Sequence, residues 1–476
     1  MSTRAASTDD PDHREELPPG SDLRGWLDHL AASNRLSVIH HGIDLRHGVA
    51  AVANRLDGST ASLFPRPGTH NGTVISGLLS QRAWMAEAVG VGEDELVSTF
   101  EAACRNPLPW TEVPHAPVQE VEHEEVDLER ILPIPTHNEH DSGSYITAGL
   151  LISRQPSTGA QNVSIHRLQV SGPDRLGALL LPRHTMRFFD ELEAADEDLE
   201  IAVVVGVDPL TLMASQAIVP LGQDELEISG ALRGAPLRVT RCRTNDVRVP
   251  ADAEIVIEGR LLANRREPEG PFGEFPQYYG ERAERHVIEV DRVTHRKDPL
   301  FHTIVGGGLE HLLLGGIPRE ASFLSHLRRT FPCVKDVHLS LGGVARYHLY
   351  VQVDQAQPGE AKNVILGALA THYDIKHVTV VDTDVDVHDP REVEWAVATR
   401  FQADRDLVVV GPSQGSKLDP STTEGVGAKL GFDATVPAGA PDMKFLRIRV
   451  PGEDDVDLEA VVDASVTDWH AAVTAR

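Results

Sequence analysis

Apolar residues recur at helical spacing near the start of the chain and then give way to short apolar runs. Four of them follow Ser21, a typical N-cap residue, and predict the first helix: Leu23, Trp26, Leu27 and Leu30. Further runs predict strands at 36–40, 61–64 and 73–76 and helices at 81–89 and 93–104. This alternation predicts an N-terminal α/β domain at 21–115. The leader before it, residues 1–20, is rich in Ser, Asp, Glu and Pro and is predicted to be disordered.

The middle of the chain changes to a β-rich pattern. Short apolar runs separated by Gly and Pro turns predict strands at 146–153, 162–170, 201–207, 237–240, 254–258 and 285–293. One helix is expected at 183–195. Strands this frequent are typical of a barrel or a sandwich, which we assign to a central domain at 116–325.

The last third alternates between strands and helices again. Strands are predicted at 337–341, 348–353, 377–381 and 407–410, and helices at 361–373 and 391–398. This order favours a third α/β domain at 326–445, of a kind often used in subunit contacts. Residues 411–433 are predicted to form a loop. A final strand at 445–450 and a helix at 458–475 make up the closing segment, 446–476.

Charge and cysteine content narrow the class of protein. The chain has 44 Lys and Arg residues against 72 Asp and Glu residues, a net charge of −28. A chain this acidic repels phosphate backbones and anionic lipid, so we expect neither nucleic acid nor membrane as a partner. Its three cysteines are widely spaced, and its first 20 residues are too polar for a signal peptide. We therefore predict a cytoplasmic protein.

The stretch 269–280, EGPFGEFPQYYG, is the first candidate for chemistry. Glu269 and Glu274 stand among glycines, Pro271 and four aromatic residues. A carboxylate that loses hydration among aromatic rings retains its proton nearer to neutral pH, as a general acid must. Glu274 lies in the more apolar part, whereas Arg265 and Arg266 favour an ionised Glu269. The alternative is a Gly/Pro turn with two surface glutamates.

A second candidate is the octapeptide 162–169, NVSIHRLQ. In a strand, Asn162, Ser164 and His166 share one face and Arg167 lies on the other, unless a bulge or strand end turns both toward one pocket. Asn, His and Glu side chains together suit Mn²⁺ or Mg²⁺ rather than a thiolate-bound metal. Other candidate members of this polar set occur in two further stretches: Arg183, His184, Asp224, Glu225 and Glu227. The alternative for both stretches is that these side chains lie on the surface in contact with solvent.

Two glycine-rich stretches are candidates for binding anions. His311 and Arg319 follow the glycine run 306–308, and a cation and an imidazole beside glycine backbone can hold a carboxylate. A helix with a glycine-broken end is the alternative there. Near the C-terminus, GVGAK at 425–429 lacks the full P-loop pattern, although its backbone amides and Lys429 can hold a single phosphate.

Taken together, seven blocks in order resemble the UbiD family of decarboxylases. They are NVSIHRLQV (162–170), LLLPRH (179–184), DELEISGALRG (224–234), TNDVRVPADAEIVIEG (244–259), EGPFGEF (269–275), VVDTDVDVHDPREVEWAVATR (380–400) and GVGAKLGFDAT (425–435). The resemblance covers most of the chain after about residue 132. It implies an N-terminal α/β domain, a central split β-barrel of the flavin-reductase type and a C-terminal α/β oligomerisation domain.

The resemblance also implies the cofactors, prenylated FMN with Mn²⁺ (or Mg²⁺) and K⁺. By motif position, Asn162, His184 and Glu225 match the family's metal ligands, with Glu227 as the alternative to Glu225. Arg167, Glu269 and Glu274 match its catalytic residues. The remaining cofactor contacts by position are Ser164, Ile165, His166, Arg183 and Lys429. Arg183 stands where other members can have an uncharged residue, which leaves its own contact with the flavin open.

The function implied is the reversible, non-oxidative decarboxylation of a small carboxylic acid. The cofactor serves as an electron sink during loss of CO₂, and a glutamic acid, here Glu274, protonates the product. His311 and Arg319 match substrate-side positions of members that act on furan-, pyrrole- or indole-type acids. Phenolic and acrylic acids remain alternatives, and a flavin reductase is the alternative of another class. A flavin prenyltransferase would supply the cofactor, and a homodimer or a multiple of dimers is expected.

Overall fold

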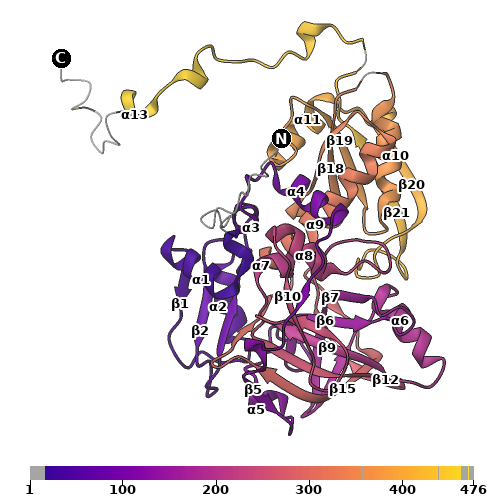
Figure 1. The fold of residues 1–476 in the computed structure, drawn as a ribbon. Coiled ribbons are helices and arrows are strands. Elements are labelled where there is room, and N and C mark those ends of the chain that lie inside the picture. The colour runs from indigo at the N-terminus through magenta and orange to yellow at the C-terminus, as the bar shows by residue number, and fades with distance from the viewer. Residues whose placement is uncertain (1–16, 356, 438, 463–469, 471–476) are drawn as a thin grey trace, which may run out of the picture. The chain divides into compact units, whose positions relative to one another are not determined.

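The computed structural model of this protein describes residues 17–355, 357–437, 439–462 and 470 (Figure 1). It divides into one unit at 1–435 and a second, smaller unit at 436–476. The first unit contains every candidate site residue. In the part of the chain that the structure describes, no helix has the length and apolar character needed to cross a membrane.

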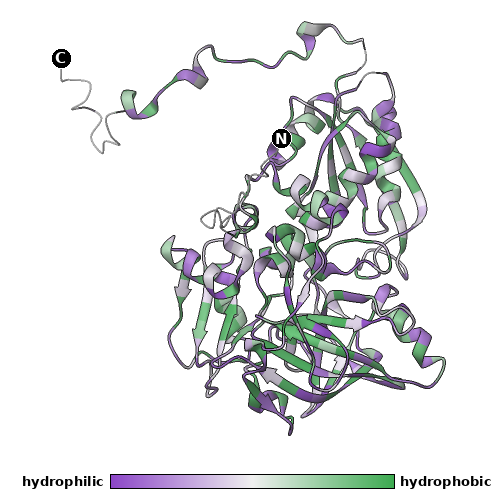
Figure 2. Ribbon diagram, in the orientation of Figure 1, coloured by the Kyte–Doolittle hydropathy of each residue, from purple (hydrophilic) through white to green (hydrophobic). Residues whose placement is uncertain are grey.

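Six antiparallel strands of the first unit close into a barrel. In spatial order they are β12 (Ile255–Glu269), β9 (Leu199–Val205), β6 (Tyr145–Arg154), β7 (Gln161–Gly172), β8 (Arg175–Ala178) and β15 (Ala283–His295). Pairing of β12 with β15 closes the ring, and β5 (Val121–His123) adds to β15 outside it. Aliphatic side chains such as Leu151, Leu168 and Val203 fill the interior. The predicted barrel is therefore confirmed, and Figure 2 shows the apolar residues along its strands.

The N-terminal part of the first unit is a four-stranded sheet covered by helices. The sheet runs β1 (Leu36–Val38), β2 (Ala61–Pro65), β3 (Thr73–Ser76) and β16 (Leu300–His302). Its last strand comes from beyond the barrel, so this layer is not built from residues 21–115 alone. The helices are α1 (Leu23–Ala32), α2 (Gly48–Leu56), α3 (Arg82–Val89) and α4 (Leu96–Arg105). Helix α1 buries the four predicted apolar residues, whereas α2 was not predicted.

Shorter elements lie before and between the barrel strands along the chain. They comprise α5 (Leu128–Ile131), α6 (His184–Glu193), α7 (Pro209–Ala214), α8 (Glu225–Arg233), β13 (Phe272–Gly273) and β14 (Tyr279–Gly280), with a small sheet of β11 (Arg248–Pro250), β10 (Arg238–Arg241) and β4 (Thr111–Glu112). Helices α6 and α8 begin at His184 and Glu225, two residues of the predicted metal set, and the third, Asn162, lies on β7.

A five-stranded sheet forms the C-terminal part of the first unit, in the order β17 (Val334–Leu339), β18 (His348–Val353), β19 (His377–Asp382), β21 (Val426–Asp433) and β20 (Leu407–Gln414). Its helices are α10 (Glu360–Thr371), α11 (Pro390–Arg400) and α12 (Ala403–Asp406). The loop predicted for 411–433 is wrong at both ends, because β20 runs to Gln414 and β21 begins at Val426. Glycine suits β21 because α10 packs directly on it: a methyl group on Gly431 would lie 2.1 Å from Cγ2 of Ile365.

One long helix, α9 (Leu309–Thr330), joins the barrel to this sheet. The sequence left it open because Gly315, Gly316 and Pro318 interrupt the helical pattern. In the fold, the side chain of Arg346 occupies the space beside Gly315 that a side chain at that position would need. A methyl group on Gly315 would lie 1.4 Å from a guanidinium nitrogen of Arg346. The stretch is helical, as the alternative expected, but the helix runs through Gly315 and Gly316 without a break and places His311 and Arg319 on one helix.

The termini differ from their predictions. Residues 1–16 lie outside the described residues, but Pro19–Ser21 form a 3₁₀ turn in which Gly20 is buried, so order begins before the predicted boundary. The strand predicted at 445–450 is wrong: those residues form none, and Ile448 is fully exposed. Alternating sequence alone cannot make a strand without a pairing partner. Of the predicted helix at 458–475, α13 (Leu458–Val461) is described, and most of the remainder lies outside the described residues.

Candidate active site

The stretch 269–280 leaves the barrel at the end of β12 and folds back as the short hairpin β13–β14. Gly270 adopts a φ of +89°, a conformation that glycine accepts without strain. The backbone of Glu274 closes the hairpin by donating to the carbonyl of Tyr278 at 2.9 Å. Phe272 and Phe275 are buried, while Tyr278 and Tyr279 are exposed. The two glutamates therefore have an apolar surrounding made by the two phenylalanines rather than by all four rings.

Arg167, from β7, lies between the two glutamates. Its Nη2 donates to Glu269 Oε2 at 2.8 Å, and its Nη1 donates to Glu274. The guanidinium carbon also lies 5.4 Å from the ring centroid of Phe272. Glu269 is fully buried and the Arg167 side chain is 9% exposed, so this is an ion-pair network largely removed from water. The turn interpretation with two surface glutamates is therefore wrong.

Sequence reasoning assigned the wrong cations to Glu269. Arg265 pairs with Glu267, and Arg266 pairs with Glu193 at 2.8 Å. Both arginines therefore have carboxylate partners other than Glu269. Its cation comes instead from β7, more than 100 residues earlier.

Tyr145 completes this network and was missed. Its hydroxyl donates to Glu269 Oε1 at 3.1 Å, and its ring packs on Phe272 with centroids 4.3 Å apart. Burial raises the pKa of Tyr145 above its usual range, so the hydroxyl stays protonated and can only donate to a carboxylate. Nothing in the sequence around Tyr145 signals this contact, because it depends on the pairing of β6 with β7.

The two glutamates differ in their surroundings. Glu269 accepts from both Arg167 and Tyr145, and two donors stabilise an ionised carboxylate. Burial raises the pKa of Glu274 above its usual range, Arg167 opposes that shift, and the charge of Glu269 adds to it. The same burial would lower the pKa of Arg167, but the two carboxylates outweigh it, so the guanidinium remains charged. The two carboxyl groups are thus not equivalent: Glu269 accepts from two donors, whereas burial favours the neutral form of Glu274.

The other face of β7 presents a separate polar row. Asn162 Nδ2 lies 3.4 Å from Ser164 Oγ, which in turn lies 2.9 Å from His166 Nε2. The alternation predicted for 162–169 is thus observed. A bulge does occur here, but on β6, where two residues oppose Arg167. Ile165 is half-buried and packs against the apolar core.

The predicted metal ligands converge on this polar row. His184 Nδ1 lies 3.1 Å from Asn162 Oδ1, and Glu225 Oε2 accepts from the backbone N–H of Val163 at 2.7 Å. Adjacent ligands of an octahedral ion with bonds of about 2.1 Å stand about 3 Å apart, which the Asn162–His184 separation matches. Burial lowers the pKa of His184, aided by the charge of Arg183, and a neutral imidazole is the form that binds metal. Asn162 and His184 thus present adjacent atoms of the kind that a hard divalent cation binds, and Glu225 reaches β7 at the next residue.

The structure distinguishes Glu225 from Glu227. Glu225 is buried and reaches β7, and burial raises its pKa to about 8. A buried carboxyl of that kind is stabilised in its charged form by a bound cation. Glu227 is half-buried, and its backbone carbonyl accepts from Leu108. Asp224 serves as the N-cap of α8 and accepts from the indole of Trp110. Glu225 is thus the acidic residue beside Asn162.

Two of the predicted cofactor residues meet the C-terminal sheet region. Arg183 Nη2 lies 3.3 Å from His372 Nε2 and from the hydroxyl of Tyr373. Lys429 Nζ donates to the carbonyls of Leu369 and His372, at the C-terminal end of α10. A lysine at a helix C-terminus is stabilised by the helix dipole. Both side chains therefore contact the end of α10 in this structure.

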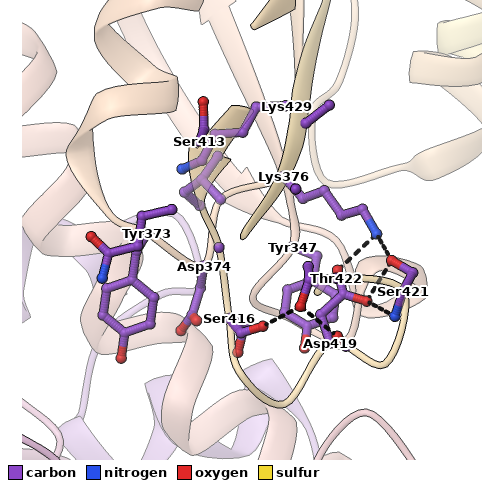
Figure 3. A pocket seen from close by; sticks show the side chains of 15 residues that line it. Tyr347, Tyr373, Asp374, Lys376, Ser413, Ser416, Asp419, Ser421, Thr422 and Lys429 are labelled. Carbon is purple, nitrogen blue, oxygen red and sulfur yellow. Dashed lines mark hydrogen bonds and ion pairs between the residues drawn. The ribbon is translucent and has the colours of Figure 1, made fainter. Parts of the chain in front are cut away.

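Lys429 also lines a cavity of about 60 Å³, drawn in Figure 3. Hydroxyl groups such as that of Ser416 surround it, and the Lys376–Asp419 ion pair, 2.8 Å long, closes one side. One water needs about 10–15 Å³ of such volume, so the cavity has room for about four to six waters.

His311 and Arg319 are half-buried on α9 and lie near a buried cation, Arg346, which sequence reasoning missed. The backbone N–H of Gly307 donates to His311 Nδ1 at 3.2 Å, so a neutral ring has its proton on Nε2. Burial lowers the pKa of His311 to about 3 and that of Arg319 to about 10. The Arg346 guanidinium carbon lies 5.3 Å from the ring centroid of Phe275, next to Glu274.

These two arginines donate to backbone carbonyls. Arg319 Nη1 donates to Gly315 at 2.6 Å, and Arg346 Nη1 to Leu312 and Ala345. Arg319 Nε is buried and makes no hydrogen bond within the described residues. One buried and one half-buried guanidinium group of this kind favour the approach of an anion.

Three family models match consecutive parts of the chain. The Rift-related domain of 3-octaprenyl-4-hydroxybenzoate carboxy-lyase, UbiD, matches residues 111–309. The C-terminal domain of the same carboxy-lyase matches residues 312–434, and its N-terminal domain matches residues 27–104. Together the three models span the first unit almost from end to end.

Solved structures agree with these matches. The UbiD-class enzyme HmfF from Pelotomaculum thermopropionicum, in complex with FMN, is 48% identical with a TM-score of 0.90, over 92% of this chain and 99% of that one. An evolved dimeric form of it, in complex with prFMN, is 45% identical with a TM-score of 0.87, over 93% and 100%. A 3,4-dihydroxybenzoic acid decarboxylase from Enterobacter cloacae is 29% identical with a TM-score of 0.86, over 93% and 99%.

Among curated relatives, the anhydromevalonate phosphate decarboxylase of Methanothermobacter thermautotrophicus is 40% identical over 376 residues. The match covers 79% of this chain and 88% of the relative. Relatives and solved structures thus include decarboxylases of both aromatic and non-aromatic acids.

Proposed function

Because this chain belongs to the UbiD family of carboxy-lyases, we propose that it decarboxylates an aromatic or heteroaromatic carboxylic acid reversibly and without net oxidation. The observation that carries the proposal is the buried network in which Arg167 lies between Glu269 and Glu274. A flavin reductase has no need of these two buried carboxylates and their shared cation. Membership of the carboxy-lyase family removes that alternative.

We propose prenylated FMN as the cofactor, which would supply an electron sink for the electron pair released with CO₂. Ser164 and His166 of the polar row, with Ile165 between them on β7, would hold it on one side. Asn162, His184 and Glu225 would hold Mn²⁺ or Mg²⁺ beside it. Arg167 Nε is buried and makes no hydrogen bond with any residue that the structure describes, which leaves a donor for substrate or cofactor. The FMN and prFMN complexes of HmfF support this assignment.

The chain's own residues would then divide the chemistry. Arg167 would orient the substrate carboxylate, since its guanidinium is permanently charged and fork-shaped. Glu269, which accepts from Arg167 and Tyr145, would fix that guanidinium in place. Glu274 would deliver a proton to the carbon that loses CO₂, and its raised pKa suits a general acid.

For the substrate we propose a furan-, pyrrole- or indole-type acid with a second acidic group. His311 and Arg346 both lie against the ring of Phe275 in residues 269–280, which we call the catalytic loop, and Arg319 lies further along α9. The imidazole N–H of His311 and the two guanidinium groups would bind that second group. Phenolic and acrylic acids are the alternative. They are supported by the relatives named for 3,4-dihydroxybenzoic acid and anhydromevalonate phosphate.

A CO₂-release screen tests the proposal. Protein produced together with a flavin prenyltransferase is offered heteroaromatic, phenolic and acrylic acids, and mass spectrometry identifies its bound flavin. We expect prenylated FMN and release of CO₂ from diacidic heteroaromatic substrates first. Bound prenylated FMN with no CO₂ released from any acid of the panel would refute the decarboxylase proposal and favour a cofactor-carrying protein.

Replacing His184 with Ala is expected to remove the divalent metal and weaken flavin retention. The reason is that His184 and Asn162 provide adjacent ligand atoms 3.1 Å apart. Metal analysis and flavin absorbance of the purified variant measure both effects. His286, also buried but on β15, is the matched control, and H286A should retain metal. Unchanged metal and flavin content in H184A would reject His184 as a ligand.

Replacing Arg319 with Ala is expected to change the ranking of substrates. Loss of this half-buried cation should lower kcat/KM for diacids by on the order of 10-fold or more relative to monoacids, while flavin spectra stay the same. Competition assays with paired mono- and diacids measure the ratio. R329A, at the end of the same helix, is the control. An equal loss on every acid would indicate a general structural role instead.

Other assignments remain predictions. They are the K⁺ ion, the cytoplasmic location, the flavin prenyltransferase as supplier of cofactor, and the three-domain division at 21–115, 116–325 and 326–445. We also propose that the chain forms a homodimer or a multiple of dimers, for which an evolved dimeric form of HmfF gives a precedent.

A further inference from the structure

Three consecutive glycines, Gly306–Gly308, lie directly behind the catalytic loop. A methyl group on Gly306 would lie 2.6 Å from the carbonyl oxygen of Gly273, and one on Gly307 would lie 2.9 Å from Cγ of Gln277. Contacts below 3.0 Å force something to move, and the first of these is with backbone. The catalytic loop thus rests against glycine backbone, with no room for a side chain between them.

The conformation of this segment is that of a tight turn. The carbonyl of Val305 accepts from the N–H of Gly308 at 3.1 Å, and Gly307 has a φ of +74°. A positive φ at the third residue is the requirement of a type II turn, which glycine meets without strain. We call residues 305–308 the glycine turn. The next residue, Leu309, begins α9.

The N-terminal layer holds the far side of the glycine turn. Asp57, at the end of α2, accepts from the N–H of Leu309 at 2.5 Å. A methyl group on Gly308 would lie 3.0 Å from the same carboxylate oxygen. Asp57 therefore acts as an N-cap for α9, although it lies about 250 positions earlier in the chain.

A second carboxylate makes the reverse connection. Glu310, on the first turn of α9, accepts from the N–H of Gly77 at 2.8 Å and from that of Leu79 at 3.2 Å. His302 Nε2 lies 3.3 Å from the same side chain. A cavity of about 10 Å³ lies between the two carboxylates, close to the volume that one water requires. Each layer thus satisfies backbone donors of the other.

We propose that Asp57 and Glu310 are positioning residues, which hold the glycine turn against the catalytic loop and so set the position of Glu274. The connection runs from Asp57 through Leu309 and the glycine turn to Gly273 and Gln277, on either side of Glu274. Gln277 is linked to Glu274 by a backbone hydrogen bond of 2.9 Å. The N-terminal layer thereby gains a part in proton delivery. The part played by Glu274 itself rests on the proposed function.

The test is Asp57→Ala in the full-length holoenzyme, with Asp22→Ala as the control. Asp22 is also an N-cap, accepting from Gly25 at 2.7 Å at the start of α1, where it is remote from the glycine turn in sequence. For D57A we expect backbone hydrogen–deuterium exchange of peptide 269–280 to rise about 10-fold or more, without that effect in D22A. We also expect deuterium transfer from D₂O to product to fall on the order of 10- to 100-fold, with metal and flavin retained.

Asp57→Asn should restore most of both signals, because an amide oxygen still accepts from Leu309. If D57A affects global stability too strongly, Gly306→Ala gives the same test from the other side, since its methyl group displaces the Gly273 carbonyl. Unchanged exchange of peptide 269–280 in both D57A and G306A would overturn the proposal. Raised exchange of peptide 269–280 in D57A, together with no release of CO₂ by the wild-type protein, would refute the proposed function and leave the positioning role standing. The two outcomes are separable because the exchange measurement needs no turnover.

Discussion

Glu274→Gln is expected to reduce deuterium transfer from D₂O to product by on the order of 10²-fold or more, and turnover with it. Glutamine retains the size of the side chain and can still bond to Arg167, but it has no proton to give. The raised pKa of Glu274 sets the direction of the pH dependence: the neutral acid persists above its usual range, and activity falls as pH rises through that pKa. A pH–rate profile of the wild-type enzyme checks this sign.

Glu269→Gln is the matched comparison for Glu274→Gln. It is expected to weaken substrate orientation through Arg167 while leaving a proton donor in place. Metal and flavin should remain bound in both variants. Near-normal deuterium transfer in E274Q together with its loss in E269Q would show that the two roles are reversed. Normal transfer in both would place the proton source outside the catalytic loop.

Arg167→Ala is expected to lower the free energy of unfolding by about 3–5 kcal/mol at neutral pH, because it leaves two buried carboxylates without their cation. Both are held by Arg167 in the native structure, and Glu269 is fully buried. In the variant their pKa values should rise above those of the unfolded chain. The destabilisation is then smallest at low pH, where both are protonated, and grows as pH rises.

Denaturant unfolding of R167A at pH 5 and pH 8 measures this difference. Arg265→Ala is the control, because Arg265 is 55% exposed and its pair with Glu267 is a surface ion pair worth about 0–1 kcal/mol. R167A should also lose activity at every pH, since no other guanidinium contacts both glutamates within the described residues. Equal free energies of unfolding of R167A and the wild type at pH 8 would mean that Arg167 and the two glutamates do not form a charged network in solution.

Much of the architecture could be predicted from the sequence because local periodicity fixes local structure. Amphipathic spacing predicted α1, and alternating runs predicted the barrel strands β6, β7, β9, β12 and β15. The two phenylalanines beside Glu274 indicated a desolvated carboxyl before any fold was known. The strand at 445–450 shows the limit of the method: its alternation is clear, but pairing requires a neighbour that sequence does not name.

The sequence by itself determined which residue types were available: an EGPFGEF turn, an NVSIHRLQ strand and scattered His, Glu and Arg residues. Only the tertiary structure decided which of them meet. Arg167 reaches Glu269 across the barrel because β7 and β12 belong to one closed sheet, whereas Arg265 and Arg266, adjacent in sequence, point elsewhere. Helix α9 forms despite its internal glycines because Arg346 fills the space at Gly315. Such contacts depend on register and packing between distant segments, which local periodicity does not encode.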